Sequence, residues 1–520
     1  MLVLVDKLDG DAKFLEGKDD LKATLAKIKS QSLRKRAERT EQIAKDSHDF
    51  AKYVACGQAY MDIYNRNPEA SENDEVLYNA GVCFGEGKSI GAEISAYNTL
   101  EKYYPKSKLT ARAVALLGKA YGDVAYYDRA SDKLEQYAKA YAGEKDAYDA
   151  MSNAVFFRKG IGDDTKAIDD TKYFIKTFSQ KKPQEAASAM FSLTSIYEKQ
   201  GDPDVVMKHL RDYIRTFGDK GGADRVVVAY AKIGQILWHQ SCPLKSEVDG
   251  SCVRIIRERA ITTKKVKKTK KGVVEQPLQC GPESKIKLTV VKRDEVKQKQ
   301  ALQAFAAAAK EYEKRQGKTG GEEAAARYYY GIAKIAEADK EFEAYLELRF
   351  PSGLNFDPAP EHKAIAAKSR KRFDEWMTQK QKVGGLARSK YDGVLAIKDP
   401  SNSITAAARI GQIAQNFSDA LFTAEIPNNV RTGEFADEKV EAFCDALTEK
   451  AEPLEALSLE AYGVCLSKST ELGWFSDWSK LCERELGQIK PEEFPTASEL
   501  RGEPNEVAPV TEVEPPIKLD

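Results

Sequence analysis

The sequence has little of what most enzymes and membrane proteins need. It contains only four histidines (His48, His209, His239 and His362), and they are scattered along the 520 residues. Its 81 basic and 81 acidic residues cancel, so no overall field attracts nucleic acid or an anionic membrane. No run reaches the roughly 18 consecutive apolar residues of a membrane helix. We therefore expect no transmembrane segment and no general affinity for nucleic acid.

The start of the chain carries no visible targeting signal. Only five apolar residues precede Asp6, whereas a secretory h-region needs about seven to fifteen. We expect no signal peptide in this chain, so an exported protein of this sequence would need a start upstream of Met1.

Signatures of catalysis are also missing. Gly317-Lys318-Thr319 resembles the end of a phosphate-binding loop, but Tyr312 stands where that loop needs its first glycine. No Cys/His or Ser/His signature is readable. An enzyme with accessory repeats would need a recognisable catalytic domain, and residues 359–490 indicate only more helices. We expect no enzymatic activity, no cofactor and no small-molecule substrate.

What the sequence does have is a repeat of about 37 residues. Four segments close on an aromatic residue, in steps of 37, 37 and 39: Tyr104 (followed by Pro105), Tyr141, Phe178 and Phe217. An apolar residue stands four positions before each, which places the pair on one helix face. A second series in phase has a small residue three positions before a large apolar one: Gly81/Phe84, Gly118/Tyr121, Ala154/Phe157, Thr194/Tyr197 and Gly234/Leu237. The unit is therefore a helical hairpin, because turn residues separate the two series.

This pattern resembles tetratricopeptide (TPR) repeats, clearly over residues 47–240 and more weakly over 298–351. The closest type is that of bacterial envelope proteins, such as the TPR lipoprotein of the outer-membrane barrel-assembly machinery. Residues 391–400, 407–412 and 424–427 resemble the C-terminal part of large myxobacterial TPR proteins, some of which serve gliding motility. The resemblance implies an all-α, right-handed solenoid whose concave groove binds other proteins. Glu93 and Lys166 depart from it, since they lie near a position where a small residue is expected.

The remaining segments set the domain boundaries. We expect a charged N-terminal leader over 1–46, the repeats over 47–240, an insertion over 241–297, resumed repeat helices over 298–358, a helical domain over 359–490, and a Pro-rich acidic, disordered tail over 491–520. Two runs of β type, 253–261 and 285–292, predict a hairpin within the insertion, which would lie between the two helices of one repeat.

The eight cysteines suggest disulfides. Cys56 and Cys83 are symmetric about a turn near Pro68, so an antiparallel helix pair would place them at one height. The same symmetry allows either Cys444–Cys465, about Pro453, or Cys465–Cys482, about the turn at 473–477; buried free thiols are the alternative. Disulfides would indicate an oxidising compartment, which predicts the periplasm or cell envelope rather than the cytoplasm.

The insertion combines cysteines with a basic run. His239, Cys242, Cys252 and Cys280 are a weak candidate zinc site, with a disulfide in the insertion or unpaired thiols as alternatives. The candidate partner-binding residues are Lys264, Lys265, Lys267, Lys268, Lys270 and Lys271, for which a solvated strand is the plain alternative. We expect a non-catalytic scaffold for assembly of an envelope complex. The alternative function is a cytoplasmic adaptor whose basic insertion binds nucleic acid or anionic membrane.

Overall fold

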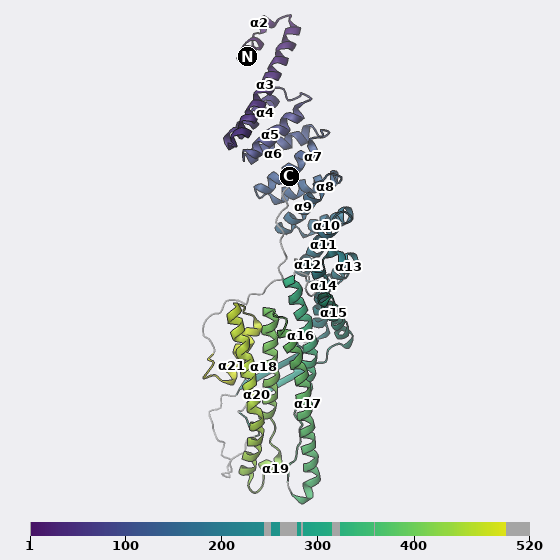
Figure 1. Cartoon of the computed structure of the whole chain (residues 1–520), viewed down its shortest axis with the longest axis vertical. Coiled ribbons are helices and arrows are strands. Elements are labelled where there is room, and N and C mark those ends of the chain that lie inside the picture. The colour runs from purple at the N-terminus through teal and green to yellow at the C-terminus, as the bar shows by residue number, and fades with distance from the viewer. Residues whose placement is uncertain are drawn as a thin grey trace, which may run out of the picture. The chain divides into compact units, whose positions relative to one another are not determined.

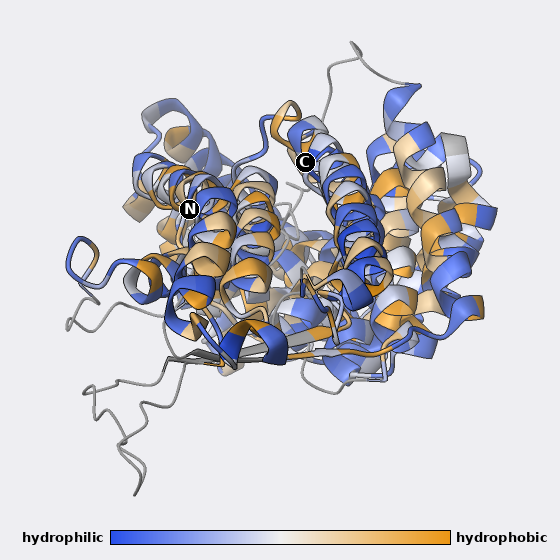
Figure 2. Cartoon of the chain, turned by 90° about the horizontal axis from the view of Figure 1, so that it is seen from below, coloured by the Kyte–Doolittle hydropathy of each residue, from blue (hydrophilic) through white to orange (hydrophobic). Residues whose placement is uncertain are grey.

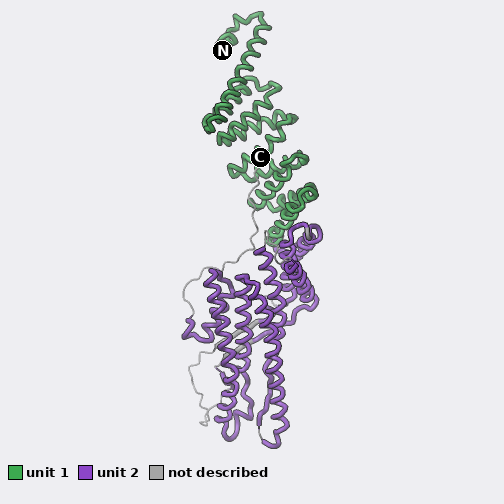
Figure 3. Tube along the Cα trace, viewed as in Figure 1, with its two compact units in different colours: residues 1–199, 512–520 green, residues 200–511 purple. Residues whose placement is uncertain are grey.

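The computed structural model describes residues 2–243, 251–259, 278–281, 284–314, 323–357 and 359–495, with backbone alone for residues 2, 219, 254–259 and 284–287. These residues form two compact units, residues 2–199 and residues 200–495 (Figure 3). The boundary falls inside the segment 47–240 that the sequence pattern treats as one array. Within the described ranges, no helix combines the length and the apolar character needed to cross a bilayer.

The first unit is entirely helical (Figure 1). Its elements are α1 (Leu2–Asp9), α2 (Ala12–Leu15), α3 (Asp19–Ser47), α4 (Phe50–Arg66), α5 (Asn73–Glu86), α6 (Ile90–Tyr103), α7 (Thr110–Asp123), α8 (Tyr127–Ala140), α9 (Ala147–Ile161), α10 (Asp164–Phe178), α11 (Pro183–Ser192) and α12 (Thr194–Gln200). From α3 to α11 each helix packs on the next along the chain. The unit is thus a stack of helical hairpins, in which each helix packs chiefly on its neighbours along the chain.

Two successive hairpins of this unit contain the same kind of contact between their own two helices. A Cβ added to Gly81 of α5 would overlap the ring of Tyr97 of α6, and one added to Gly118 of α7 would lie 2.7 Å from Cγ of Leu134 of α8. Both the glycines and their partners are 37 residues apart. The small residues of the sequence pattern are therefore the points where the paired helices approach most closely.

The large residues of the same pattern contact the preceding helix instead. A Cβ added to Gly57 of α4 would overlap the ring of Phe84 of α5, whereas Gly81 of α5 faces α6. Tyr121 of α7 is likewise buried, and its hydroxyl accepts from the side-chain amide of Asn98 of α6 at 3.2 Å. The two members of one sequence pair therefore join their helix to different neighbours, one before it and one after it.

The third and fourth pairs are less deeply buried than the first two. Ala154 of α9 is buried, but Phe157 is only partly buried and stacks on Tyr127 of α8, with the ring centres 5.1 Å apart. Tyr197 of α12 is also partly buried. The recurring spacing thus predicts where each large residue packs, but it does not predict how deeply.

In this unit, two of the closing aromatic residues of the repeats pack on the aromatic residue one helical turn before them. The rings of Tyr137 and Tyr141 lie 5.6 Å apart, and those of Phe174 and Phe178 lie 5.4 Å apart. Each pair spans one turn of helix. Tyr104 closes the first repeat through its hydroxyl, which donates to the carbonyl oxygen of Pro68 at 3.0 Å.

Two glycines of adjacent helices give a matched stability test. Gly81→Ala is expected to destabilise the protein by about 1–3 kcal/mol, since the methyl group meets the Tyr97 ring. Gly91→Ala in α6 is expected to stabilise it by up to about 1 kcal/mol, because no atom lies within 4 Å of the added methyl. Urea unfolding monitored by circular dichroism measures both changes. Equal effects of the two substitutions would contradict the close-packing role of Gly81.

The chain that leads into the Thr194/Tyr197 pair forms two helices, α11 and α12. The structure ends α11 at Ser192 and begins α12 at Thr194. Around this break the Ser192 hydroxyl donates to the carbonyl oxygen of Ala189, and the Ser195 hydroxyl to that of Ser192. Such bonds compete with the helical ladder, which explains the interruption.

The described residues of the second unit form helices and one pair of strands. Its elements are α13 (Pro203–Phe217), the short 3₁₀ helices η1 (Gly218–Gly221) and η2 (Pro360–His362), α14 (Ala223–Ser241), β1 (Val253–Arg259), β2 (Ser284–Val290), α15 (Glu295–Glu313), α16 (Glu323–Glu347), α17 (Lys363–Leu395), α18 (Pro400–Phe422), α19 (Asn428–Arg431), α20 (Ala436–Leu472) and α21 (Asp477–Ile489). Figure 2 shows hydrophobic and hydrophilic residues alternating along the helices, as expected where one face is buried. Both repeat series continue here, since the rings of Tyr213 and Phe217 lie 6.0 Å apart and Leu237 of α14 is buried.

Helix α20 corrects one prediction. The sequence pattern places a turn beside Pro453, but α20 runs unbroken from Ala436 to Leu472 with Pro453 inside it. Cys444 and Cys465 therefore lie about 30 Å apart along one helix, at 1.5 Å per residue. The alternative disulfide Cys444–Cys465 is excluded by this distance.

Candidate functional site: the anchored insertion

The insertion lies between two helices that pack as an antiparallel pair. Gly234 of α14 faces the ring of Phe305 of α15, at 2.7 Å from the position of an added Cβ. The chain leaves the pair after Ser241 and returns at Asp294, whose backbone N–H donates to the carbonyl oxygen of Ser241 at 2.7 Å. The two ends of the insertion are thus adjacent, and the helix pair is complete without the residues between them.

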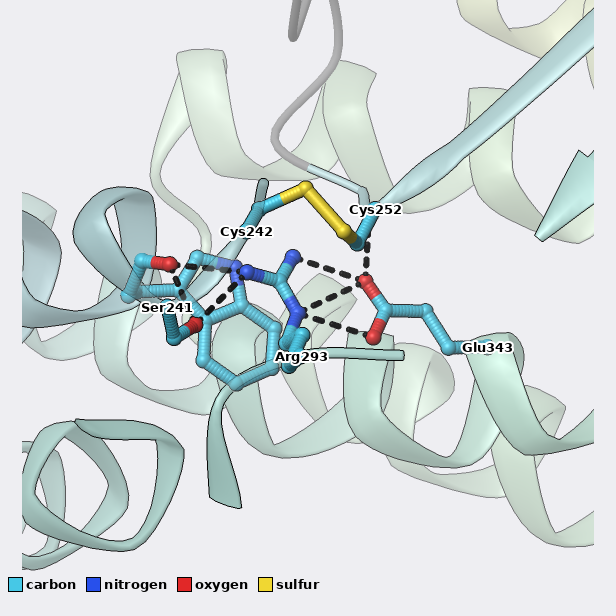
Figure 4. Close-up of a disulfide and its surroundings, with 6 residues drawn as sticks. Ser241, Cys242, Cys252, Arg293 and Glu343 are labelled. Carbon is cyan, nitrogen blue, oxygen red and sulfur yellow. Dashed lines mark hydrogen bonds and ion pairs between the residues drawn. A yellow bond between two sulfur atoms is a disulfide. The ribbon is translucent and has the colours of Figure 1, made fainter. Parts of the chain in front are cut away.

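The first anchor is a disulfide with a buried ion pair (Figure 4). Cys242, directly after α14, is bonded to Cys252, directly before β1. The backbone N–H of Cys252 donates to Oε1 of Glu343 on α16 at 2.7 Å. Arg293 approaches the same carboxylate, with its Nη2 2.7 Å from Oε1 and its Nε 2.9 Å from Oε2. One carboxylate therefore holds both the outgoing and the returning chain.

The rest of Arg293 is occupied by the end of α14. Its Nη1 donates to the carbonyl oxygen of Trp238 at 2.7 Å and to the hydroxyl of Ser241 at 3.0 Å. The guanidinium lies over the Trp238 ring, 3.8 Å from the ring centre. Burial raises the pKa of the Glu343 carboxyl, and the Arg293 charge opposes that rise. We call the Arg293–Glu343 pair the clamp. Its polar atoms are already bonded within the protein, so its role is structural.

The two strands continue from this clamp. They are antiparallel, with Val253 opposite Val290 and Arg259 opposite Ser284. The start of β1 and the end of β2 pack into a hydrophobic cluster with residues of α16, α17 and α18, among them Phe342. The sheet is thus fixed to the body of the second unit rather than extending freely from it.

The second anchor lies further along the insertion. Cys280 is bonded to Cys444 of α20. The backbone N–H of Gly281 donates to the carbonyl oxygen of Phe422, and that of Ile426 donates to the carbonyl oxygen of Leu278, both at 2.9 Å. Residues 278–281 therefore run beside the end of α18 and are crosslinked to α20. In the sequence, the basic run stands between β1 and this second anchor.

The structure describes only some of the site residues that the sequence predicts. Lys264, Lys265, Lys267, Lys268, Lys270 and Lys271 lie outside the described residues. The zinc candidates are corrected, because Cys242 and Cys252 are bonded to each other and Cys280 to Cys444, so none of these sulfurs is a free thiolate beside His239. No group of three metal-ligating side chains occurs in the part of the chain that the structure describes.

The eight cysteines all form disulfides. Cys56 of α4 is paired with Cys83 of α5, and Cys465 of α20 with Cys482 of α21. Both pairs join neighbouring helices across a turn, in the arrangement that sequence symmetry describes. Cys280–Cys444 spans 164 residues, and no local symmetry could indicate it.

Sequence reasoning missed the clamp itself. Arg293 and Glu343 are 50 residues apart in the sequence, and each resembles the many charged residues of a solvated helix face. One signal was available, because Trp238 near the end of α14 and Arg293 just before α15 flank the insertion where its two ends must meet.

No protein-family model matches the chain, and no curated protein sequence is similar to it. Solved structures match the chain over most of its length, and three of them illustrate the likeness. The TPR domain of P58(IPK) has 10% identity, covering 88% of this chain and 98% of that one, with a TM-score of 0.20. A circular tandem repeat protein has 9% identity, covering 94% and 95%, with a TM-score of 0.19. The Naa15/Naa10 complex bound to HypK-THB has 11% identity, covering 94% and 79%, with a TM-score of 0.24. At these TM-scores the fold class depends on the chain's own hairpins, described above.

Proposed function

We propose that this protein is a non-catalytic TPR scaffold that assembles a protein complex in the bacterial cell envelope. The observation that carries the proposal is the stack of helical hairpins in the first unit, joined in sequence to a second unit with a doubly anchored insertion. Stacked repeats of this kind present extended surfaces to other proteins. A motility complex of the envelope is one assembly of this class, in keeping with the resemblance of residues 391–427.

Two features support the envelope as the compartment. All eight cysteines are placed in pairs, and structural disulfides persist where the surroundings are oxidising. Two of the pairs hold the insertion, so a reducing compartment would remove both of its covalent anchors.

The basic insertion is the proposed partner-binding element. Residues 254–271 contain nine basic residues and one acidic residue. The described parts of the insertion on either side are fixed by the clamp and by the two disulfides. A basic segment whose two flanks are fixed is suited to an acidic protein surface. It loses less conformational entropy on binding than a free tail does.

A triple charge reversal tests this element. Lys264→Glu, Lys267→Glu and Lys270→Glu together are expected to weaken binding of an acidic partner at least about tenfold, since opposite charges become like charges. The matched control reverses three exposed lysines of the second unit, Lys299, Lys310 and Lys439. The measurement is crosslinking and co-purification of partners from the native source at about 0.15 M salt.

The two variants separate the possible results. Loss of a protein partner in the insertion variant alone supports the proposal. Unchanged partners in both variants would remove the insertion from the binding surface. Loss of DNA or anionic-vesicle binding, with a steep dependence on salt, would instead favour an adaptor for nucleic acid or membrane.

A further inference from the structure

A cavity of about 670 Å³ lies in the second unit, away from the clamp. Its lining comes from the chain between α16 and α17, from Lys380 of α17, from the end of α18 and the segment around α19, and from Leu288 of β2. Charged and amide side chains line it, among them Arg349, Lys380, Asn416, Asp419 and Glu425. This volume suits a small molecule or the end of a peptide.

Lys380 of α17 is the unusual member of this lining. It is 1% exposed. Its Nζ donates to the carbonyl oxygen of Tyr345 at 2.8 Å and to Oδ1 of Asn416 at 2.9 Å, and lies 3.7 Å from the centre of the Tyr345 ring. These acceptors are all neutral. Among the described residues, no carboxylate oxygen lies within 4 Å of this amine.

Other deeply buried cations of this chain are paired with carboxylates. Arg158 contacts Asp170 at 2.7 Å and three further carboxylates. Arg409 contacts Asp339 at 2.9 Å, and Arg293 contacts Glu343 in the clamp. A buried charge without a counterion is costly, so such pairing is the rule. Lys380 departs from that rule, and it lines an open cavity.

The charges around the cavity indicate the kind of ligand. Burial, together with the charge of Arg349, lowers the pKa of Lys380 to about 7. Asp419 and Glu425 line the same cavity and disfavour a ligand with several negative charges. A ligand with a single carboxylate and neighbouring N–H groups suits both the basic and the acidic residues of the lining. Its carboxylate can pair with the basic residues, and its N–H groups can donate to Asp419 or Glu425.

We propose that this cavity binds an α-carboxylate, the acidic end of a peptide or of a free amino acid, and that Lys380 and Arg349 supply its counter-charge. This inference is independent of the scaffold function and of the compartment. Both sources share the carboxylate, so probes that differ elsewhere distinguish them.

Isothermal titration calorimetry on the full, oxidised chain tests the proposal with three probes: N-acetyl-alanyl-alanine, its C-terminal amide, and free alanine. We expect saturable binding of a free-carboxylate probe at up to about 10 mM, and none of the amide. Preference for the peptide would identify a peptide terminus, and preference for alanine a free amino acid. Equal binding of the amide, or no binding of either acid, would overturn the proposal.

Lys380→Met tests the counter-charge directly, with thermal stability measured beside affinity. It is expected to weaken carboxylate binding at least about thirtyfold, because a buried counter-charge is lost. Its thermal stability is expected to fall modestly, because the carbonyl oxygen of Tyr345 and Oδ1 of Asn416 lose their buried donor, and the removal of an unpaired buried charge offsets part of that loss. Lys368→Met, on an exposed part of the same helix, should change neither property. Unchanged affinity in Lys380→Met would contradict the inference.

The pH dependence gives a second readout. A bound carboxylate favours the charged form of Lys380, so the complex takes up a proton wherever the free amine is neutral. Affinity is therefore expected to fall by up to about tenfold per pH unit above about pH 7, and to level off below it. A flat profile across this range would exclude Lys380 as the counter-charge.

Discussion

Replacing Arg293 with methionine is expected to destabilise the second unit by about 3–5 kcal/mol, because the Glu343 carboxylate stays buried without its counterion. Arg293 also donates to the carbonyl oxygen of Trp238 and to the hydroxyl of Ser241, so the substitution leaves further buried acceptors unpaired. Denaturant unfolding monitored by circular dichroism measures the change.

The double variant Arg293→Met with Glu343→Gln is the control for this expectation. The introduced glutamine is neutral, and its side-chain carbonyl can still accept from the backbone N–H of Cys252, which donates to the native carboxylate at 2.7 Å. The loss should then be at least about 1 kcal/mol smaller than in Arg293→Met alone. A double variant as unstable as the single one would mean that the charge of Glu343 is not what makes Arg293 necessary.

Removal of the Cys280–Cys444 disulfide is expected to cost about 4–5 kcal/mol, as this bond closes a loop of 164 residues. The Cys242–Cys252 bond closes a loop of only 10 residues, and its loss should cost about 3 kcal/mol. The variants are Cys280→Ala with Cys444→Ala, and Cys242→Ala with Cys252→Ala. Urea unfolding without reductant compares both with the wild type.

The order of the two losses is the informative result. Both disulfides hold the insertion. A difference between the two losses in unfolding free energy therefore reflects the length of chain that each disulfide restrains in the unfolded state. A larger loss for the 242–252 pair would indicate that the insertion is held chiefly at its clamp. It would also contradict the second anchor as a major restraint on the unit.

The helical repeats could be predicted from the sequence because they depend on local chemistry. Gly81 and Gly118 lack a side chain where Tyr97 and Leu134 approach, and the same spacing separates the two contacts. Periodic small and aromatic residues therefore carry information about packing that a single sequence shows directly. The Cys56–Cys83 pairing follows from the same logic, since one short turn relates the two helices.

The contacts that complete the second unit could not be predicted in this way. Cys280 and Cys444 are 164 residues apart in sequence, and only tertiary packing brings them together. The pattern around Pro453 indicates a turn, but helix α20 continues through it. Proline usually ends a helix, but tertiary packing can outweigh that cost. Lys380 resembles any solvated lysine in sequence, and only the packing of α16, α17 and α18 reveals its burial without a counterion.

A disulfide-held scaffold of an oxidising compartment should contain no free thiol, so the free-thiol content of the native protein is the decisive measurement. The protein is purified from its natural source with alkylation during lysis, denatured without reductant, and weighed by mass spectrometry. We expect no alkylated cysteine before reduction and eight after it, because all eight are paired. Eight alkylated cysteines before reduction would place the protein in a reducing compartment and contradict the proposed role in the cell envelope.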